Sequence, residues 1–441
     1  MLERLALAVG IFEIPLQLDK YYGFQKEHAD LGAVAGLNVS ITLIALVFLY
    51  FVWFVRGIQP IAGGLKRWVV GAPMLVYISF VVLSVFTAEV QFLAVCDCFL
   101  LAQAYALFFY VANRIDDYRD LVFTVMAIAA TLVMQCILIF GLATLGESAR
   151  GEAFKYGPLL LSVWIDGRPA GSMHSAVLAG SVMAMMWLPV MGLSLSSVSS
   201  RIKKLALVAM AIGLLGILLT QTRGAIGTTI VGIGVIGFAA FTRGWLPKQA
   251  ITAAVVLALI CAVPLAVVIQ KRVLGDDGGS AVARKHLTVI AINMIKERPL
   301  LGYGAGNCHL AGIPFANTAD YRAEWYYTIH CKYLLTWIET GIFGFVSFLC
   351  IVGAGIRYGW KAWLINNRRY APIGLAIAFA IVGHAVHMLV DIFNSRTQVQ
   401  MLWLFLGLAA ATYRLAQTSP GGQMQSTGRT SHSVGGLWNG C

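Results

Sequence analysis

LVFTVMAIAATLVMQCILIFGLA, residues 121–143, contains no charged side chain. A helix needs about 20 such residues to cross the ~30 Å hydrocarbon layer of a bilayer. Apolar runs of similar length recur along the chain, which has 441 residues, 59% of them hydrophobic and only 12% charged. A soluble globular protein carries about 25% charged residues. The composition therefore predicts an all-α, polytopic membrane protein.

Working outward from residues 121–143, we predict about twelve membrane spans from apolar length. The first is the weakest, because Glu13 and Pro15 interrupt it and Asp19 follows closely. The predicted spans are 5–18, 37–55, 68–86, 90–112, 121–143, 173–197, 205–220, 225–241, 250–269, 333–356, 371–393 and 399–415.

An even number of spans places both termini on one side of the membrane. Segments on that side carry more than twice as many lysines and arginines as the short loops opposite. The positive-inside rule then predicts that both termini are cytoplasmic and accounts for the net charge of +12 without invoking nucleic acid. We expect one membrane domain, 1–417, and a disordered cytoplasmic tail, 418–441, which is rich in Ser, Gly and Thr.

The long polar segment 270–332 should then be external and should contain short helices. Helical composition over 280–298 ends at Pro299, which cannot continue a helix. The glycine-rich run 302–306 predicts a tight turn with an exposed backbone. His330 ends the loop, just before an apolar helix.

Three residues of this pattern suggest chemistry on an anionic substrate. Arg223 lies at a membrane edge on the sparsely basic side, although it could simply be an interfacial anchor. Arg284 lies on the loop helix, where a solvated surface charge is the alternative. His330 is a candidate general base, because an imidazole with a pKa near 6.5 accepts a proton at neutral pH, or else an interfacial histidine. Glu339, about two and a half turns deeper, would be an intramembrane functional or structural partner.

Two further groups of polar residues admit several interpretations. His384, His387 and Asp391 share one helical face, which favours a polar packing network over an incomplete metal site. We therefore predict no metal and no cofactor. The segment Gly167–Ser175 supplies Arg168 and His174 before an apolar helix, although its serines could act only as caps.

Four sequence pieces, in this order, resemble the O-antigen ligase and O-antigen polymerase superfamily of membrane glycosyltransferases. They are Gly167-Arg168…Gly171-Ser172, Thr222-Arg223-Gly224, Arg298-Pro299-Leu300-Leu301-Gly302-Tyr303-Gly304-Ala305-Gly306-Asn307, and His330…Leu334…Glu339-Thr340-Gly341-Ile342-Phe343-Gly344. The resemblance covers about residues 160–350. Cys331 departs from it, since the family often carries Asn or Ser after the histidine.

The resemblance implies a multi-pass protein of the bacterial inner membrane that takes an undecaprenyl-diphosphate-linked glycan as donor. It implies inverting, metal-independent transfer at the periplasmic face, with His330, Arg223 and Arg284 as catalytic residues. We expect Arg168, His174 and Arg322 to help hold the donor or the acceptor, and Glu339 to contribute to substrate binding. The expected acceptor is a sugar of the lipid A core, so that the chain would act as an O-antigen ligase in lipopolysaccharide biosynthesis.

Two alternatives remain open. The same motifs suit a polymerase that extends a polysaccharide on its lipid carrier, and the basic loop favours the ligase only slightly. A non-enzymatic transporter of lipid-linked glycans would carry broken or charged helices near the membrane midplane in two corresponding halves. Here the polar content is concentrated in the external loop instead.

Overall fold

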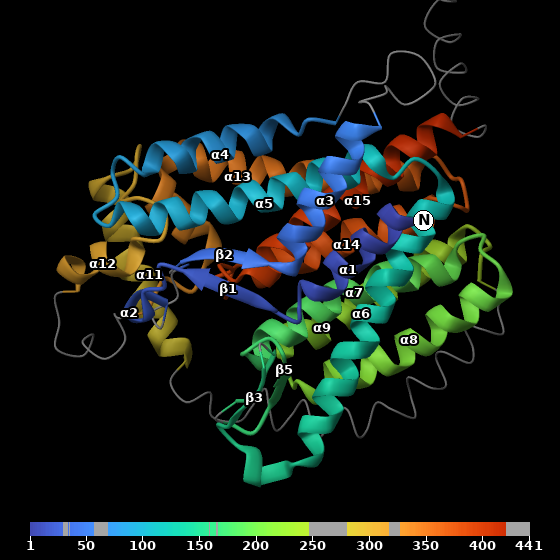
Figure 1. Ribbon diagram of the computed structural model, residues 1–441, viewed down its shortest axis with the longest axis horizontal. Helices are drawn as coiled ribbons and strands as arrows, with labels where there is room; N and C mark the ends of the chain where they lie inside the picture. Colours follow the sequence, from blue (N-terminus) through green and yellow to red (C-terminus); the bar gives the residue numbers. More distant parts are fainter. Residues whose placement is uncertain are drawn as a thin grey trace, which may run out of the picture.

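The computed structural model describes residues 1–29, 34, 36–56, 69–157, 159–164, 166–246, 280–316 and 327–419. Its helices pack into one bundle (Figure 1). Eleven of the twelve predicted spans coincide with a helix, and the span 250–269 lies outside the described residues. These helices are α1 (Leu2–Glu13), α3 (Ile41–Val55), α4 (Ala72–Ser84), α5 (Gln91–Arg114), α6 (Tyr118–Thr144), α7 (Ala176–Leu195), α8 (Ser200–Leu219), α9 (Arg223–Thr242), α13 (Lys332–Leu364), α14 (Ala371–His387) and α15 (Arg396–Thr418).

Within the described residues, seven helices are long and apolar enough to cross a membrane: α5, α6, α7, α8, α9, α13 and α15. Helices α3, α4 and α14 are apolar but shorter. A multi-pass membrane protein is therefore confirmed, whereas the number twelve stays a prediction. The predicted tail 418–441 lies outside the description beyond Ser419.

The helices begin where the sequence supplies acceptors for free backbone N–H groups. Ser40, Asp117, Ser199 and Ser395 each accept a hydrogen bond from the backbone three residues on, at the starts of α3, α6, α8 and α15. Such N-caps satisfy donors that have no partner inside a helix. The predicted spans therefore begin within a few residues of the observed helices.

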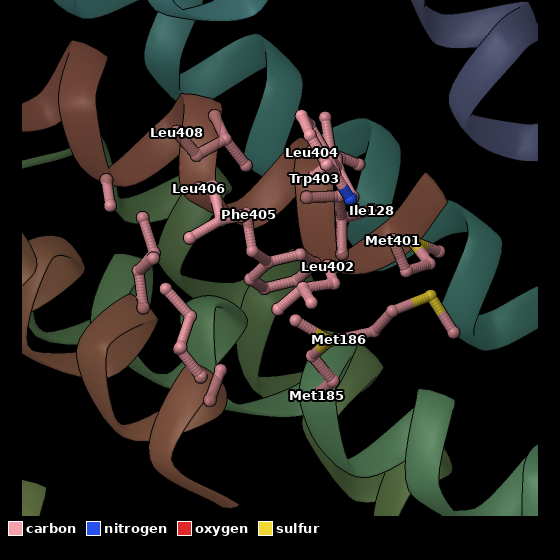
Figure 2. Packing of buried hydrophobic residues seen from close by; sticks show 14 of the residues in the cluster. Ile128, Met185, Met186, Met401, Leu402, Trp403, Leu404, Phe405, Leu406 and Leu408 are labelled. Carbon is pink, nitrogen blue, oxygen red and sulfur yellow. The ribbon is translucent and has the colours of Figure 1, made fainter. Parts of the chain in front are cut away.

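The centre of the bundle is formed by α7 and α15. The most apolar windows of these helices are 94% and 89% buried, against 28% and 33% for α8 and α9. Figure 2 shows Met185 and Met186 of α7 packed against residues 401–408 of α15. Because α8 and α9 leave apolar side chains such as Leu207 and Phe238 exposed, we infer that this pair of helices faces lipid.

Two small antiparallel sheets were not predicted by the all-α assignment. Strands β1 (Asp19–Tyr22) and β2 (Leu37–Ser40) form a pair, and β3 (Ala153–Tyr156), β4 (Leu159–Val163) and β5 (Pro169–Gly171) form a three-stranded sheet. Strand β1 carries Asp19 and Lys20 in four residues, so it lacks the apolar alternation that marks a strand. The fold is mostly helical with these two additions.

The described parts of the segment 270–332 form α11 (Ser280–Glu297), α12 (Cys308–Ala311) and the short 3-10 helix η2 (Ile313–Phe315). The predicted end of the first helix before Pro299 is confirmed. Figure 1 shows α11 and α12, together with the short helix α2 (Lys26–Ala29), at the end of the bundle away from the N-terminus.

Candidate functional site

Helix α13 is broken at Gly341, and this break holds the glycine-rich turn that follows α11. Gly341 has φ 71° and ψ −177°, and a Cβ atom there would lie 1.9 Å from the carbonyl oxygen of Leu300. The backbone of residues 299–304 uses this space: Tyr303 N–H donates to the carbonyl of Ile338 at 2.8 Å. The predicted tight turn is confirmed, because Gly302, Gly304 and Gly306 all have positive φ. The predicted exposure of its backbone is wrong, because residues 302–306 are buried against α13.

Glu339 is part of this junction. Its side chain is 5% exposed, and its Oε1 accepts a hydrogen bond of 3.0 Å from the backbone N–H of Gly306. Its backbone carbonyl accepts a second one from Gly304 at 3.0 Å. The structure thus gives Glu339 the task of fixing the turn against α13, and a direct role in substrate binding stays a prediction.

His330 is half-buried and lies two residues before α13. The backbone N–H of Lys332 donates to the carbonyl of Met388 at 2.9 Å, which joins this helix start to the end of α14. Beneath it, Ile329 belongs to an apolar cluster with Leu287 and Ile290 of α11. Three elements therefore fix the position of the histidine.

The electrostatic surroundings of His330 come from two of these elements. Burial lowers the pKa of His330 below its usual value, while the carboxylate of Asp391 raises this pKa. Arg284 of α11 lowers the pKa as well, and a backbone hydrogen bond with Thr328 raises it. A ring held mainly in its neutral form at pH 7 can accept a proton, as a general base must.

Arg284 itself is exposed on α11, and its carbonyl oxygen accepts a hydrogen bond from the hydroxyl of Thr288 at 2.7 Å. About two turns further along the helix, Ala291 and Met294 are buried in the apolar cluster beneath His330. Arg284 acts electrostatically on His330 and on His387. Its guanidinium is therefore close to the histidine yet still available to an anion.

Arg223 is the first residue of α9 and is also exposed. At the next residue, Gly224, an added Cβ would lie 2.7 Å from Nδ1 of His387. Nε2 of His387 in turn lies 3.7 Å from Oδ2 of Asp391. The start of α9 thus packs against His387, the partner of Asp391, and His330 and Arg284 interact electrostatically with this pair.

Asp391 lies outside the helix in which the sequence placed it. Helix α14 ends at His387, six residues before the predicted end of the span, and the chain then turns. In that turn Oδ2 of Asp391 accepts a hydrogen bond of 2.6 Å from the side chain of Gln398.

Among the described residues, no group of three or more His, Cys, Asp or Glu side chains lies close enough together to hold a metal ion.

A cavity of about 840 Å³ lies beside this cluster. Its wall includes Asp19 and Asn38 of the β1–β2 pair, Lys155 of β3, and Arg396 at the start of α15. His174 also lines it; partial burial lowers the pKa of its ring, and Asp19 opposes this shift. The backbone of His174, two residues before α7, has a φ of 57°.

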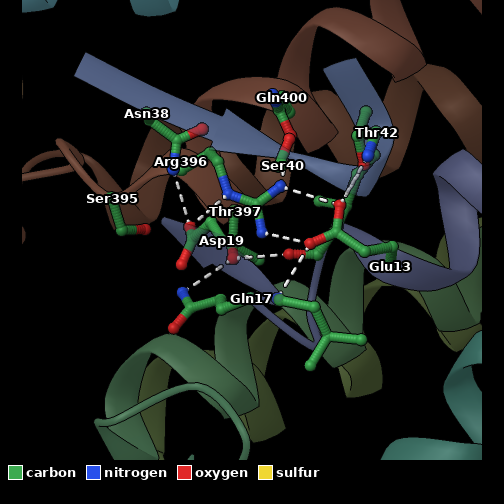
Figure 3. Close-up of polar contacts among 12 residues, drawn as sticks. Glu13, Gln17, Asp19, Asn38, Ser40, Thr42, Ser395, Arg396, Thr397 and Gln400 are labelled. Carbon is green, nitrogen blue, oxygen red and sulfur yellow. Dashed lines mark hydrogen bonds and ion pairs between the residues drawn. The ribbon is translucent and has the colours of Figure 1, made fainter. Parts of the chain in front are cut away.

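A buried ion-pair network supports the inner wall of the cavity (Figure 3). Arg396 donates to both carboxylate oxygens of Glu13, at 2.7 and 3.0 Å, and its Nε lies 2.9 Å from Asp19. Thr42 donates to Glu13 through its N–H at 3.0 Å and through its hydroxyl. Glu13, which weakened the first predicted span, is therefore a structural counter-ion from α1 to α15.

The two other predicted substrate residues are placed differently. Arg168 pairs with Asp166 at 2.6 Å in the turn before β5 and is not part of the cavity wall. Arg322 lies outside the described residues. Sequence reasoning missed Asp19 and Arg396, although an acidic residue in one apolar segment and a basic residue at the start of another is a signal of a buried pair.

The comparisons with known proteins concern the second half of the chain. No curated protein matches the sequence. A family model described as O-antigen ligase matches residues 205–349, a range that contains Arg223, Arg284, His330 and Glu339 but neither Arg168 nor His174. This segment, which carries Arg223, Arg284 and His330, is therefore similar to the O-antigen ligase family.

Proposed function

We propose that the protein transfers a glycan from an undecaprenyl diphosphate carrier to an acceptor hydroxyl at the external surface of the bacterial inner membrane. The observation that carries the proposal is the convergence of Arg223, Arg284 and His330 on the His387–Asp391 pair. Two exposed cations and a neutral imidazole at one place suit the departure of a diphosphate and the activation of a hydroxyl.

In the proposed reaction, the neutral ring of His330 takes the proton of the acceptor hydroxyl as its oxygen attacks the anomeric carbon. The bond between that carbon and the phosphate oxygen breaks, so the electron pair leaves with the lipid diphosphate and the configuration inverts. Arg223 and Arg284 stabilise the charge that develops on the leaving group. Asp391 stabilises the protonated ring of His330 until the proton passes to solvent.

The family match and the cationic surface favour lipid A core as the acceptor, which would make the protein an O-antigen ligase. A phosphorylated core is anionic and complements a cationic site. A polymerase would use the same cluster but would take a second lipid-linked glycan as acceptor. The choice of acceptor therefore separates the two activities.

The test is transfer by the purified full chain in nanodiscs, with the undecaprenyl-linked donor and either lipid A core or donor alone, with and without chelator. Loss of the base in His330→Gln should lower the rate about 10²–10⁴-fold. Arg284→Gln should also lower it, whereas Lys285→Gln, the exposed neighbour on α11, should leave it unchanged. Product on core identifies a ligase, and lengthened donor identifies a polymerase. Wild-type rates in His330→Gln would refute the assigned base, and donor movement across the bilayer without transfer would favour a transporter.

A further inference from the structure

We infer that the cavity of about 840 Å³ is a binding site for the sugar chain of a substrate, separate from the cationic group that takes the diphosphate. The inference rests on the proposed function. It assigns to the cavity a neutral, hydroxyl-rich ligand in the form of a short stretch of glycan. The volume lies within the range of about 300–1,000 Å³ that small-molecule sites occupy.

The charges of the cavity wall balance one another. Arg396 is paired with Asp19 in the wall and with Glu13 behind it, and Lys155 is the other charged residue of the wall among those that the structure describes. With Glu13 included, the two cations are equal in number to the two carboxylates, and His174 is mainly neutral at pH 7 because its pKa is lowered. A described wall without net charge suits hydroxyl groups, whereas a diphosphate would need the exposed cations Arg223 and Arg284.

The wall also offers the two surfaces that sugars use. Tyr21 and Phe24 present aromatic rings, with centroids 5.8 Å apart, to the face of a pyranose. Asn38 supplies hydrogen bonding: its side chain is 2% exposed, and its Oδ1 accepts no hydrogen bond among the described residues. A buried acceptor of this kind requires a donor, and a ligand hydroxyl in the cavity supplies one.

Two hydrogen bonds link the region of the cavity wall to sequence neighbours of the catalytic residues. On one side, Asn394 of the wall accepts a hydrogen bond of 2.6 Å from Nζ of Lys332, two residues after His330. On the other, Thr222 beside Arg223 donates to the carbonyl of Ala176 at 2.8 Å, two residues after His174. These links place the cavity wall close enough in the fold for a glycan bound there to extend towards the catalytic residues.

The test measures binding of lipid-free oligosaccharide to the full chain in nanodiscs, by ligand-observed NMR. Two probes separate the sources: glycan released by mild acid from the lipid-linked donor, and delipidated core oligosaccharide. Phe24→Ala removes a stacking ring and Leu160→Trp fills the cavity from β4. Each should raise the Kd about tenfold, as loss of about 1.4 kcal/mol does. Tyr22→Ala, an exposed ring outside the wall, and Tyr156→Trp on β3 should not change it.

Binding does not require the base, so His330→Gln should bind as the wild type does. The probe that binds identifies the glycan as that of the donor or of the acceptor. Absence of binding by both probes, or binding that neither Phe24→Ala nor Leu160→Trp weakens, would overturn the inference. If the wild type binds glycan but transfers none in any assay, the proposed function is contradicted and the inferred glycan site is still supported.

Discussion

The buried network around Arg396 gives a stability prediction in which single and double substitutions are not additive. Arg396 faces two carboxylates, those of Glu13 and Asp19, and its side chain is 2% exposed. Breaking a buried ion pair from one side destabilises a protein by about 3–5 kcal/mol, because one charge is left without a partner. The two partners are unequal here, so the two single substitutions should differ.

Glu13→Leu leaves Arg396 paired with Asp19, and we expect the lower end, about 3 kcal/mol. Arg396→Leu strands two carboxylates, and we expect about 5 kcal/mol or more. The double substitution leaves only Asp19 without its cation, and Asn38 still donates to Asp19 at 2.7 Å. The double variant should therefore lose about 3 kcal/mol, well below the sum of the two single losses.

The measurement is the free energy of unfolding from denaturant titration in detergent micelles, followed by tryptophan fluorescence. Arg56→Leu is the matched control, since Arg56 pairs with Glu3 at 2.5 Å but its side chain is 62% exposed. An exposed pair contributes about 0–1 kcal/mol. Equal losses for Glu13→Leu and Arg396→Leu, or a double variant whose loss equals their sum, would refute the assignment of Arg396 as a shared counter-ion.

Three further predictions follow from the same structure. Gly341→Ala should destabilise the fold by more than about 3 kcal/mol in the same denaturant titration, because strain at a positive φ adds to a steric clash. As a control, Gly353→Ala, which lies in open space on the same helix, should stabilise the fold by up to about 1 kcal/mol. Burial lowers the pKa of His309 to about 4, so the free energy of unfolding should fall by about 2 kcal/mol from pH 8 to pH 5, and this part of the loss should be absent from His309→Leu. Asp391→Asn should move the acidic limb of the kcat/KM profile to lower pH, because the carboxylate raises the pKa of His330; an unchanged limb would exclude His330 as the titrating base.

The helices could be predicted from the sequence because the bilayer imposes a local rule. Each span must provide enough consecutive apolar residues by itself, so its position can be read without knowing its neighbours. Residues 121–143 illustrate this, because α6 covers Tyr118–Thr144 and therefore contains the whole predicted span. The start of α11 near Ser280 and its end before Pro299 followed from equally local information.

The β1–β2 pair could not be predicted in the same way, because its support comes from distant parts of the chain. Asp19 of β1 is neutralised by Arg396, which lies at the other end of the sequence. Asn38 of β2 donates a hydrogen bond to Asp19, and as a polar residue it adds nothing to an apolar alternation in the strand. Pairing that depends on a buried charge from a remote helix leaves no periodic signal in either strand.

The candidate site was predictable in its members but not in its arrangement. Arg223, Arg284 and His330 were chosen from residue type, position and family resemblance, and the structure brings them near one another. The role of Asp391 could not be read, because a continued helix after His387 would have directed the carboxylate along the α14 face. Helix α14 ends before Asp391, and the electrostatic influence of its carboxylate on His330 depends on the tertiary structure.

The arrangement separates two kinds of polar surface that a glycan transferase on lipid carriers needs at once. A diphosphate needs accessible cations, and Arg223 at the start of α9 and Arg284 in the second turn of α11 are exposed. A sugar chain needs polar walls without net charge, since a free cation there would hold the diphosphate in the wrong place. The Glu13–Arg396–Asp19 network buries its one cation between two carboxylates. The residues that complicated the first predicted span are thus the ones that prevent Arg396 from acting as a free cation in the cavity.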